Sequence, residues 1–185
     1  MGTLRYSINV TLDGSCHHEV GLPPDQESMR YWTAQVQEAD AMLFGRVTYE
    51  LMESAWRRPP SGEWPDWMRP WELPFARAID RARKYVVSHS LDTVDWNAEL
   101  LRGDLLAQVE LLKSQHARLW VGGVTLPVAL AQHGLIDEYE FLVHPVVAGR
   151  GPALLGGLTE QLRLELVERR ELRSGAVACR YRPVS

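Results

Sequence analysis

Four short polar segments follow apolar runs along this chain, and their residue types suit the binding of an anionic ligand. They are Asp13-Gly14, Gly45-Arg46, Ser88-His89 and Gly122-Gly123. In an open sheet of parallel strands, ligands bind beyond the carboxyl ends of the strands. We therefore expect the four segments to meet along one edge of such a sheet.

The Gly122-Gly123 pair stands between an apolar run and a helix predicted to begin near Thr125. Glycines let the backbone approach a ligand closely, and a helix N-terminus offers free N–H groups and a positive dipole end. The pair therefore predicts a diphosphate site. A tight turn without a ligand explains it equally well, and the GxGxxG pattern of the Rossmann fold is absent.

Gly45, Arg46 and Thr48 form a second strand-to-helix turn. The Arg46 guanidinium is a fork of donors suited to phosphate, and the Thr48 hydroxyl can bind another phosphate oxygen. Ser88 and His89 end a later strand, and we expect them to join Arg46 around a 2′-phosphate. The alternative is that Thr48 caps its helix, Arg46 is a solvated charge and His89 has no function.

Cys16-His17-His18 has the residue types of a metal site. Adjacent histidines point in different directions, however, and no second group of ligands stands elsewhere in the sequence. We therefore predict no metal site.

Periodicity and turn residues predict strands that alternate with helices and are followed by a run of strands. Strands are predicted at 4–12, 41–44, 84–88, 119–121 and 138–147, with a short extended piece after 92–96. Helices are predicted at 29–39, 48–56, 75–82, 100–116 and 125–133, and a hairpin at 162–168 and 176–182. The order predicts an α/β fold over a single domain, residues 1–185. Its mostly parallel central sheet is flanked by helices and carries an antiparallel C-terminal hairpin.

Residues 57–73 contain four prolines, which exclude a long helix or a central strand. Three tryptophans lie among them, so we predict an ordered loop pinned by aromatic rings. The loop either shields the site from water or serves packing alone.

Composition narrows the class of protein. The net charge of −4 weighs against nucleic acid as the main partner, because phosphate backbones require a basic face. Two cysteines form no disulfide framework and fit a reducing compartment. No signal peptide or membrane-spanning run is recognised, so we expect a cytoplasmic protein.

Taken together, these segments resemble one superfamily across nearly the whole chain. The sequence is similar to the dihydrofolate-reductase-like proteins, which include the reductase domain of bacterial riboflavin biosynthesis. The resembling stretches are Ser7 to Gly14, Leu43 to Glu50, Lys84 to Ser88, Trp120 to Leu126, and Pro145-Val146-Val147 with the glycine loop after it.

The resemblance implies NADPH as cofactor. Gly45, Arg46 and Thr48 match the turn that contacts cofactor phosphates, and Ser88 and His89 match the strand end near the 2′-phosphate. The matches continue in the diphosphate loop at Gly122, Gly123, Val124 and Thr125, and in the backbone that meets the nicotinamide amide at Asn9 and Val10. The resemblance also implies a homodimer, because relatives commonly pair.

Two departures separate the chain from the best-known members. Folate reductases place an acid at the start of the helix after the first loop, where this chain has Met29, with Glu27 two residues earlier. Riboflavin reductases usually have a glutamate before the glycine pair and a lysine after Asp-Gly, where this chain has Val121 and Ser15. The chain therefore resembles the stand-alone branch of the superfamily.

We accordingly predict an NADPH-dependent oxidoreductase that reduces a small heterocyclic or carbonyl substrate by hydride transfer. Asp13 is the candidate proton donor or water organiser. The substrate pocket is predicted to be lined by Trp32, Tyr49 and Trp56 together with Asp13 and the 15–27 loop. The alternatives are a non-catalytic nucleotide- or flavin-binding module and an interaction protein that uses its tryptophans to bind a partner.

Overall fold

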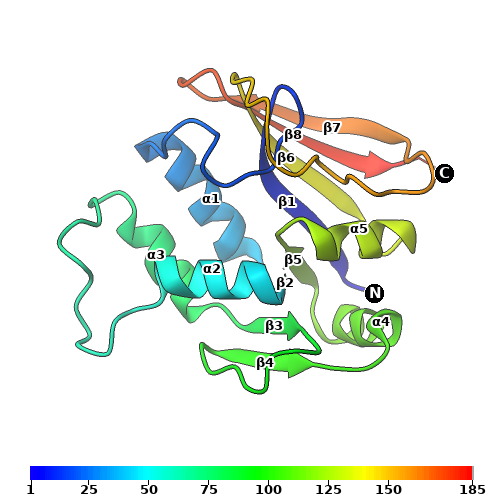
Figure 1. Ribbon diagram of the computed structural model, residues 1–185, viewed down its shortest axis with the longest axis horizontal. Coiled ribbons are helices and arrows are strands. Elements are labelled where there is room, and N and C mark those ends of the chain that lie inside the picture. The colour runs from blue at the N-terminus through cyan, green and yellow to red at the C-terminus, as the bar shows by residue number, and fades with distance from the viewer. Residues whose placement is uncertain (185) are drawn as a thin grey trace.

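A single eight-stranded sheet organises the protein, whose computed structural model describes residues 1–184 (Figure 1). The strand order is β4-β3-β2-β5-β1-β6-β8-β7. The strands are β1 (Thr3–Thr11), β2 (Ala41–Gly45), β3 (Lys84–Val87), β4 (Ala98–Leu101), β5 (Arg118–Val121), β6 (Glu138–His144), β7 (Leu164–Glu171) and β8 (Val177–Pro183). Pairings from β4 to β6 are parallel, and those of β8 with β6 and β7 are antiparallel. The predicted α/β sheet is confirmed.

Five helices cover the two faces of the sheet. They are α1 (Gln26–Glu38), α2 (Arg46–Trp56), α3 (Leu73–Arg81), α4 (Leu105–Gln115) and α5 (Thr125–Gln132). One core joins α4 and α5 to β1, β5 and β6, and a second core lies beneath α1, α2 and α3. Figure 1 shows this division, with α4 and α5 set apart from the other three helices. Within residues 1–184 no helix is both long and apolar enough to cross a membrane.

Strand β2 shows how the sequence fills both cores. Its four apolar residues are buried, because successive side chains of a strand point to opposite faces. Leu43 joins the core beneath α4 and α5, whereas Met42 and Phe44 join the core beneath α1 to α3. A continuous apolar run is therefore what a strand covered on both faces requires.

The start of α1 is set by a capping box at Asp25. The Asp25 carboxylate accepts a hydrogen bond from the Ser28 amide at 2.7 Å, and the Asp25 amide donates to the Ser28 hydroxyl at 3.0 Å. Asp25 occupies the cap position, and Ser28 completes the box three residues later. The cap fixes the helix that carries Met29 and Trp32 toward the centre of the molecule.

The segment at residues 98–104 corrects one prediction. The apolar spacing placed a helix at 100–116, but Leu100 and Leu101 belong to strand β4, which pairs with β3. Helix α4 begins only after Asp104, whose carboxylate accepts from the Ala107 amide at 2.9 Å. Gly103 at φ +94° makes the turn between strand and helix. Leu101 thus packs into the same core as the helix stripe, but from a strand.

The Trp- and Pro-rich loop at 57–72 is built of turns and leaves the body of the protein between α2 and α3 (Figure 1). Trp71 packs on the second core, whereas Trp67 is exposed. Arg57 anchors the start of the loop through its guanidinium, which contacts Glu53 at 2.6 Å and Asp95 at 2.7 Å.

A buried polar layer lies between α1 and the sheet. The Glu140 carboxylate on β6 accepts from the Tyr31 hydroxyl at 2.6 Å, from Ser7 at 3.0 Å and from Arg180 at 3.1 Å. Arg5 lies at the edge of this layer with its Nη1 3.9 Å from Glu140. This network ties α1 to three strands.

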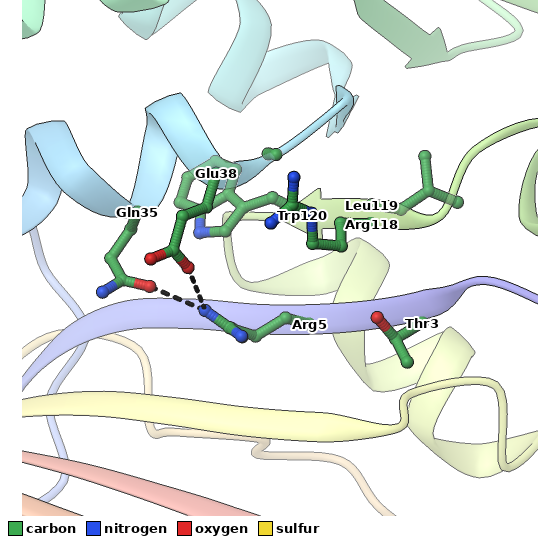
Figure 2. A pocket seen from close by; sticks show the side chains of 8 residues that line it. Thr3, Arg5, Gln35, Glu38, Arg118, Leu119 and Trp120 are labelled. Atoms are coloured by element: carbon green, nitrogen blue, oxygen red, sulfur yellow. Dashed lines mark hydrogen bonds and ion pairs between the residues drawn. The ribbon is translucent and has the colours of Figure 1, made fainter.

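Figure 2 shows the far end of the same layer, where Arg5 on β1 extends toward Gln35 and Glu38 on α1. The Arg5 Nη1 donates to the side-chain oxygen of Gln35 at 2.7 Å and lies 3.8 Å from the Glu38 carboxylate. The cavity between them measures about 20 Å³, which is room for about one water molecule. This cavity cannot hold a cofactor or substrate.

We predict that Lys84 makes the protein more stable as pH rises from 8 to 10. Lys84 is fully buried, its ammonium donates to the Ala82 carbonyl at 2.7 Å, and it lies 4.0 Å from the centre of the Trp96 ring. Burial lowers the Lys84 pKa from 10.5 to about 8. Between these values the unfolded chain binds more protons than the folded protein, so the free energy of unfolding increases with pH.

Relative to Lys84→Met, which removes the titrating group while keeping an apolar stem, the wild-type protein should gain about 2 kcal/mol of unfolding free energy between pH 7 and pH 10. Urea unfolding of both proteins at each pH measures this difference, because other groups whose pKa burial raises, such as Cys16 and Tyr139, affect both proteins alike. Equal gains in the two proteins would exclude Lys84 as the cause.

Candidate functional site

The carboxyl ends of the central strands lie side by side. Gly45 at the end of β2 pairs with Val87 at the end of β3, and Val121 at the end of β5 pairs with both Leu43 and Tyr6. The segments at 45–48, 88–89 and 122–125 therefore share one edge of the sheet. This is the arrangement that the sequence predicted for them.

The two glycine turns of this edge are in close contact. Gly123 has φ +96°, and a Cβ atom placed on it would lie only 2.3 Å from the Thr48 hydroxyl oxygen. A Cβ on Gly45 would lie 3.7 Å from Leu126, in ordinary contact. The first turn of α2 thus fits against the first turn of α5, and only glycine at position 123 permits this fit.

The α5 turn presents backbone donors at this contact. Val124 precedes the helix and Thr125 begins it, and no side chain caps this end. Helix α2 likewise begins after Gly45 without a side-chain cap. Two uncapped helix N-termini side by side offer free N–H groups and positive dipole ends to an anion.

Arg46 is held by a surface ion pair. Its guanidinium lies 2.9 Å from the Glu50 carboxylate, one helical turn onward, and both side chains are about half exposed. Ser88 is buried, and its hydroxyl accepts from the amides of Ser90 and Leu91, whereas His89 is exposed. The Ser88 hydroxyl thus shapes its turn, and Arg46 and His89 face solvent beside it.

A cavity of about 390 Å³ opens next to the glycine turns. Thr48, Gly122 and Gly123 form one part of its wall, and β1 contributes Asn9 and Val10. The remaining wall is mainly apolar and comes from α1, α2 and their neighbours: Met29, Trp32, Val36, Leu51, Met52, Trp56, Phe75 and Trp120. The predicted pocket residues Trp32 and Trp56 both line it.

A chain of hydrogen bonds orients one polar group in this wall. The Leu22 amide donates to Nδ1 of His144 at 3.2 Å, so the proton of the neutral ring is on Nε2. Nε2 then donates to the Asn9 side-chain oxygen at 2.9 Å. Burial lowers the His144 pKa and keeps the ring neutral. The Asn9 Nδ2 group makes no hydrogen bond within residues 1–184, and Asn9 is one of the residues that line the cavity.

The structure corrects the role predicted for Asp13. Its carboxylate accepts hydrogen bonds from the Thr11 hydroxyl at 2.5 Å, from the Gly149 amide at 2.7 Å and from the Ala148 amide at 3.0 Å. These bonds lower the Asp13 pKa to about 2. An ionised carboxylate has no proton to donate, and Asp13 is not part of the cavity wall. It instead fastens the 145–157 loop to the end of β1.

The position predicted for Tyr49 in the pocket wall is also wrong. The ring is only 3% exposed and packs in the core beneath α1 to α3. Its hydroxyl donates to Glu53 at 3.1 Å and accepts from the Trp96 amide at 3.4 Å. Tyr49 therefore anchors α2 to the core and does not line the cavity.

Sequence reasoning missed His144, although a signal for it exists. His144 ends β6, which lies next to β1 in the sheet. The predicted strand continued to residue 147, which hid this strand end. Pro145 has no amide to continue the ladder, so the strand ends one residue earlier.

The residues at the edge suit a dinucleotide. Gly122 and Gly123 leave a backbone cradle that side chains would fill, because added Cβ atoms would lie 2.8 Å from the Trp120 ring and 2.3 Å from Thr48. The free N–H groups of the two helix N-termini can bind phosphate oxygens, and the adjoining apolar cavity can hold flat rings. Within residues 1–184, no group of three or more His, Cys, Asp or Glu side chains is placed to hold a metal ion.

Comparisons with known proteins agree on the kind of fold. A family model described as the RibD C-terminal domain matches residues 3–178. YyaP of Bacillus subtilis (strain 168) is 29% identical over 184 residues, covering 94% of this chain and 91% of that protein.

Two solved structures are also similar. A protein of Shewanella sp. PV-4, provisionally named a riboflavin biosynthesis protein, has a TM-score of 0.76 at 18% identity and covers 99% of both chains. Dihydrofolate reductase of Enterococcus faecalis, complexed with NADP(H) and RAB-propyl, has a TM-score of 0.67 at 12% identity. That match covers 100% of this chain and 98% of the other. The chain therefore belongs to the RibD C-terminal domain family and has a dihydrofolate-reductase-like fold.

Proposed function

We propose that the protein is an NADPH-dependent reductase of a small heterocyclic or carbonyl substrate. The observation that carries the proposal is that the glycine cradle and the apolar cavity form one continuous site, since Thr48, Gly122 and Gly123 belong to both. The likeness to a reductase that was solved with NADP(H) supports this choice of cofactor.

The binding residues divide along the edge of the sheet. Backbone amides of 122–125 and the Thr48 hydroxyl hold the diphosphate, and Arg46 with Ser88 and His89 holds the 2′-phosphate. The backbone at Asn9 and Val10 positions the nicotinamide. When bound, NADPH supplies the hydride that reduces the substrate.

The chain itself positions the substrate and excludes water. Trp32, Trp56 and Phe75 close the cavity with apolar surface, which strengthens polar contacts inside it. Among residues 1–184 no Asp or Glu lines the cavity, so no carboxylic acid of its wall supplies the proton that completes the reduction. Asp13 keeps the loop at 145–157 in place beside this wall.

Steady-state oxidation of NADPH tests the proposal with a panel of carbonyls, quinones, pterins and flavins. We expect turnover with at least one class. The absence of a carboxylate from the cavity wall favours one rival, a module that binds a nucleotide or flavin without turnover. Cofactor binding without NADPH oxidation by any compound would establish that rival instead.

We predict that Arg46→Ala weakens NADPH binding by roughly tenfold and leaves NADH binding nearly unchanged, because a charge-assisted phosphate contact is worth about 1.5–3 kcal/mol. The ion pair with Glu50 does not prevent this contact, since exposed pairs are weak. Calorimetric titration with both cofactors measures the difference.

Arg118→Ala is the matched control. Arg118 is an exposed arginine paired with Asp40 at 3.9 Å, but it begins β5 at the opposite end of the sheet. Its loss should leave both affinities unchanged. If Arg46→Ala weakens NADPH and NADH equally, the 2′-phosphate site lies elsewhere.

The homodimer and the cytoplasmic location are part of the same proposal. Strand β7 forms one of the two edges of the sheet, and Leu166 and Val167 on it are exposed. We propose this hairpin face as the contact between two copies.

A further inference from the structure

The cavity wall is notable for the charges it lacks. Of the residues that the structure describes, 25 line it, and none of these is Asp, Glu, Lys or Arg. The three histidines of the wall are His17, His18 and His144. His144 is buried and neutral, because burial lowers its pKa and its Nδ1 accepts the Leu22 amide.

His17 and His18 are the two histidines of the wall that are not buried. Their rings stack on one another with centres 4.8 Å apart, and the His18 side chain is more than half exposed. The Glu19 carboxylate lies 3.8 Å from the His18 ring. An anionic group deep in the cavity therefore has no cation of the wall to pair with, and burying an unpaired charge is costly.

The depth of the cavity is shaped for a ring. Trp32 of α1 and Trp56 of α2 line it. The Trp56 ring makes a T-shaped contact with the Phe75 ring, with 4.8 Å between the ring centres. Met29 and Met52 complete the wall, and thioethers adapt well to aromatic surfaces. Aromatic and thioether side chains around an uncharged space select a flat, apolar ligand.

Asn9 provides the polar contact. His144 Nε2–H donates to the Asn9 side-chain oxygen at 2.9 Å, so the hydrogen-bonding group that remains on this exposed, cavity-lining side chain is the Nδ2 donor. His144 is itself fixed by the Leu22 amide, and its ring packs against Gly21, where a Cβ would lie 3.3 Å away. An oriented N–H in an apolar wall matches a single acceptor oxygen on the ligand.

We propose that the cavity takes an uncharged aromatic carbonyl compound, with its oxygen bound by Asn9 Nδ2 and with His144 as the residue that positions Asn9. This inference rests on the proposed function and names the substrate class of that site. It also excludes substrates that carry a phosphate or carboxylate beside the reacting group.

Three matched probes test the proposal by equilibrium dialysis at pH 8 with saturating NADPH, so that the anion-binding turns at Thr48 and Gly123 are already filled. They are 2-acetylnaphthalene, 2-ethylnaphthalene, which lacks the acceptor oxygen, and 6-acetyl-2-naphthoate, which adds one negative charge. We expect the ketone to bind about fivefold more tightly than the hydrocarbon, as one neutral hydrogen bond provides. We expect the charged ketone to bind at least roughly 30-fold more weakly than the neutral one.

Two variants test whether Asn9 makes the polar contact with the ketone and whether His144 orients Asn9. Asn9→Ala should reduce ketone binding to the level of the hydrocarbon and leave hydrocarbon binding unchanged. His144→Leu should have most of the same effect, because the Asn9 amide then loses its orientation. Hydrocarbon binding serves as the folding control, since a collapsed cavity would weaken all three probes, and the double variant should be no worse than Asn9→Ala alone.

Equal affinity for the neutral and charged ketones, or an Asn9→Ala effect of the same size on ketone and hydrocarbon, would overturn the inference. If NADPH still binds in that case, only the substrate class is wrong. If NADPH does not bind either, the proposed function fails with it.

Discussion

Gly123→Ala should weaken NADPH binding by roughly 100-fold, the largest single effect we expect on the cofactor. The new Cβ would lie 2.3 Å from the Thr48 hydroxyl oxygen, and the backbone at φ +96° is one that L-residues rarely adopt. The variant must therefore separate the two turns that form the cradle. Thermal unfolding together with calorimetric titration of NADPH measures both consequences.

Gly134→Ala is the matched control for this change. Gly134 follows the other end of α5, also has positive φ at +65°, and has no atom within 4 Å of an added Cβ. It should lower stability by about 1 kcal/mol through backbone strain alone and leave NADPH affinity unchanged. Similar losses of NADPH affinity in the two variants would mean that strain, and not the cradle, controls binding.

Glu140→Ala should lower the free energy of unfolding by about 3–5 kcal/mol, the largest effect we expect on stability. Glu140 is 1% exposed and accepts hydrogen bonds from Tyr31, Ser7 and Arg180. Its removal leaves the Arg180 guanidinium without its buried carboxylate and the Tyr31 hydroxyl without an acceptor. Because Tyr31 belongs to α1, the helix that carries Met29 and Trp32, the cavity should loosen as well.

The control is Glu168→Ala, which removes another carboxylate from the same arginine. Glu168 lies 3.0 Å from Arg180, but its side chain is 56% exposed. Exposed ion pairs contribute about 0–1 kcal/mol, so this variant should remain close to wild type in urea unfolding. If the two variants lose equal stability, burial of Glu140 is not what gives the network its importance.

The sheet and its binding edge could be predicted because their signals are local. Apolar runs such as Ala41–Phe44 are typical of strands covered on both faces, and Gly134 after α5 indicates a helix end. The turns at 45–48 and 122–125 each stand between a strand and a helix, so parallel topology puts them at the same edge of the sheet, and the pairing of β2 with β5 makes them neighbours. The structure places them in contact.

Other features depend on tertiary contacts that local patterns do not contain. Leu100 and Leu101 fit a helical stripe as well as a strand, and the pairing of β4 with β3 decides between them. Asp13 was correctly placed in a turn, but its ion-stabilising partners Ala148 and Gly149 lie far along the chain. Tyr49 falls on α2 as predicted, while only the packing against Trp96 shows that it faces inward.

The same limit applies to the polar contact of the cavity. Asn9, Leu22 and His144 lie on three separate segments and form one hydrogen-bonded chain only after β1 and β6 pair. Spacing in the sequence carries no sign of this chain. A search for polar residues at every predicted strand end would have found His144, provided that the end of β6 was placed before Pro145.

Calorimetric titration of the wild-type protein with NADPH tests the central claim most directly. We expect saturable one-to-one binding in the micromolar range, weakened roughly 100-fold in Gly123→Ala and unchanged in Gly134→Ala. A wild-type protein that gives no binding heat and no change in tryptophan fluorescence with millimolar NADPH would contradict it.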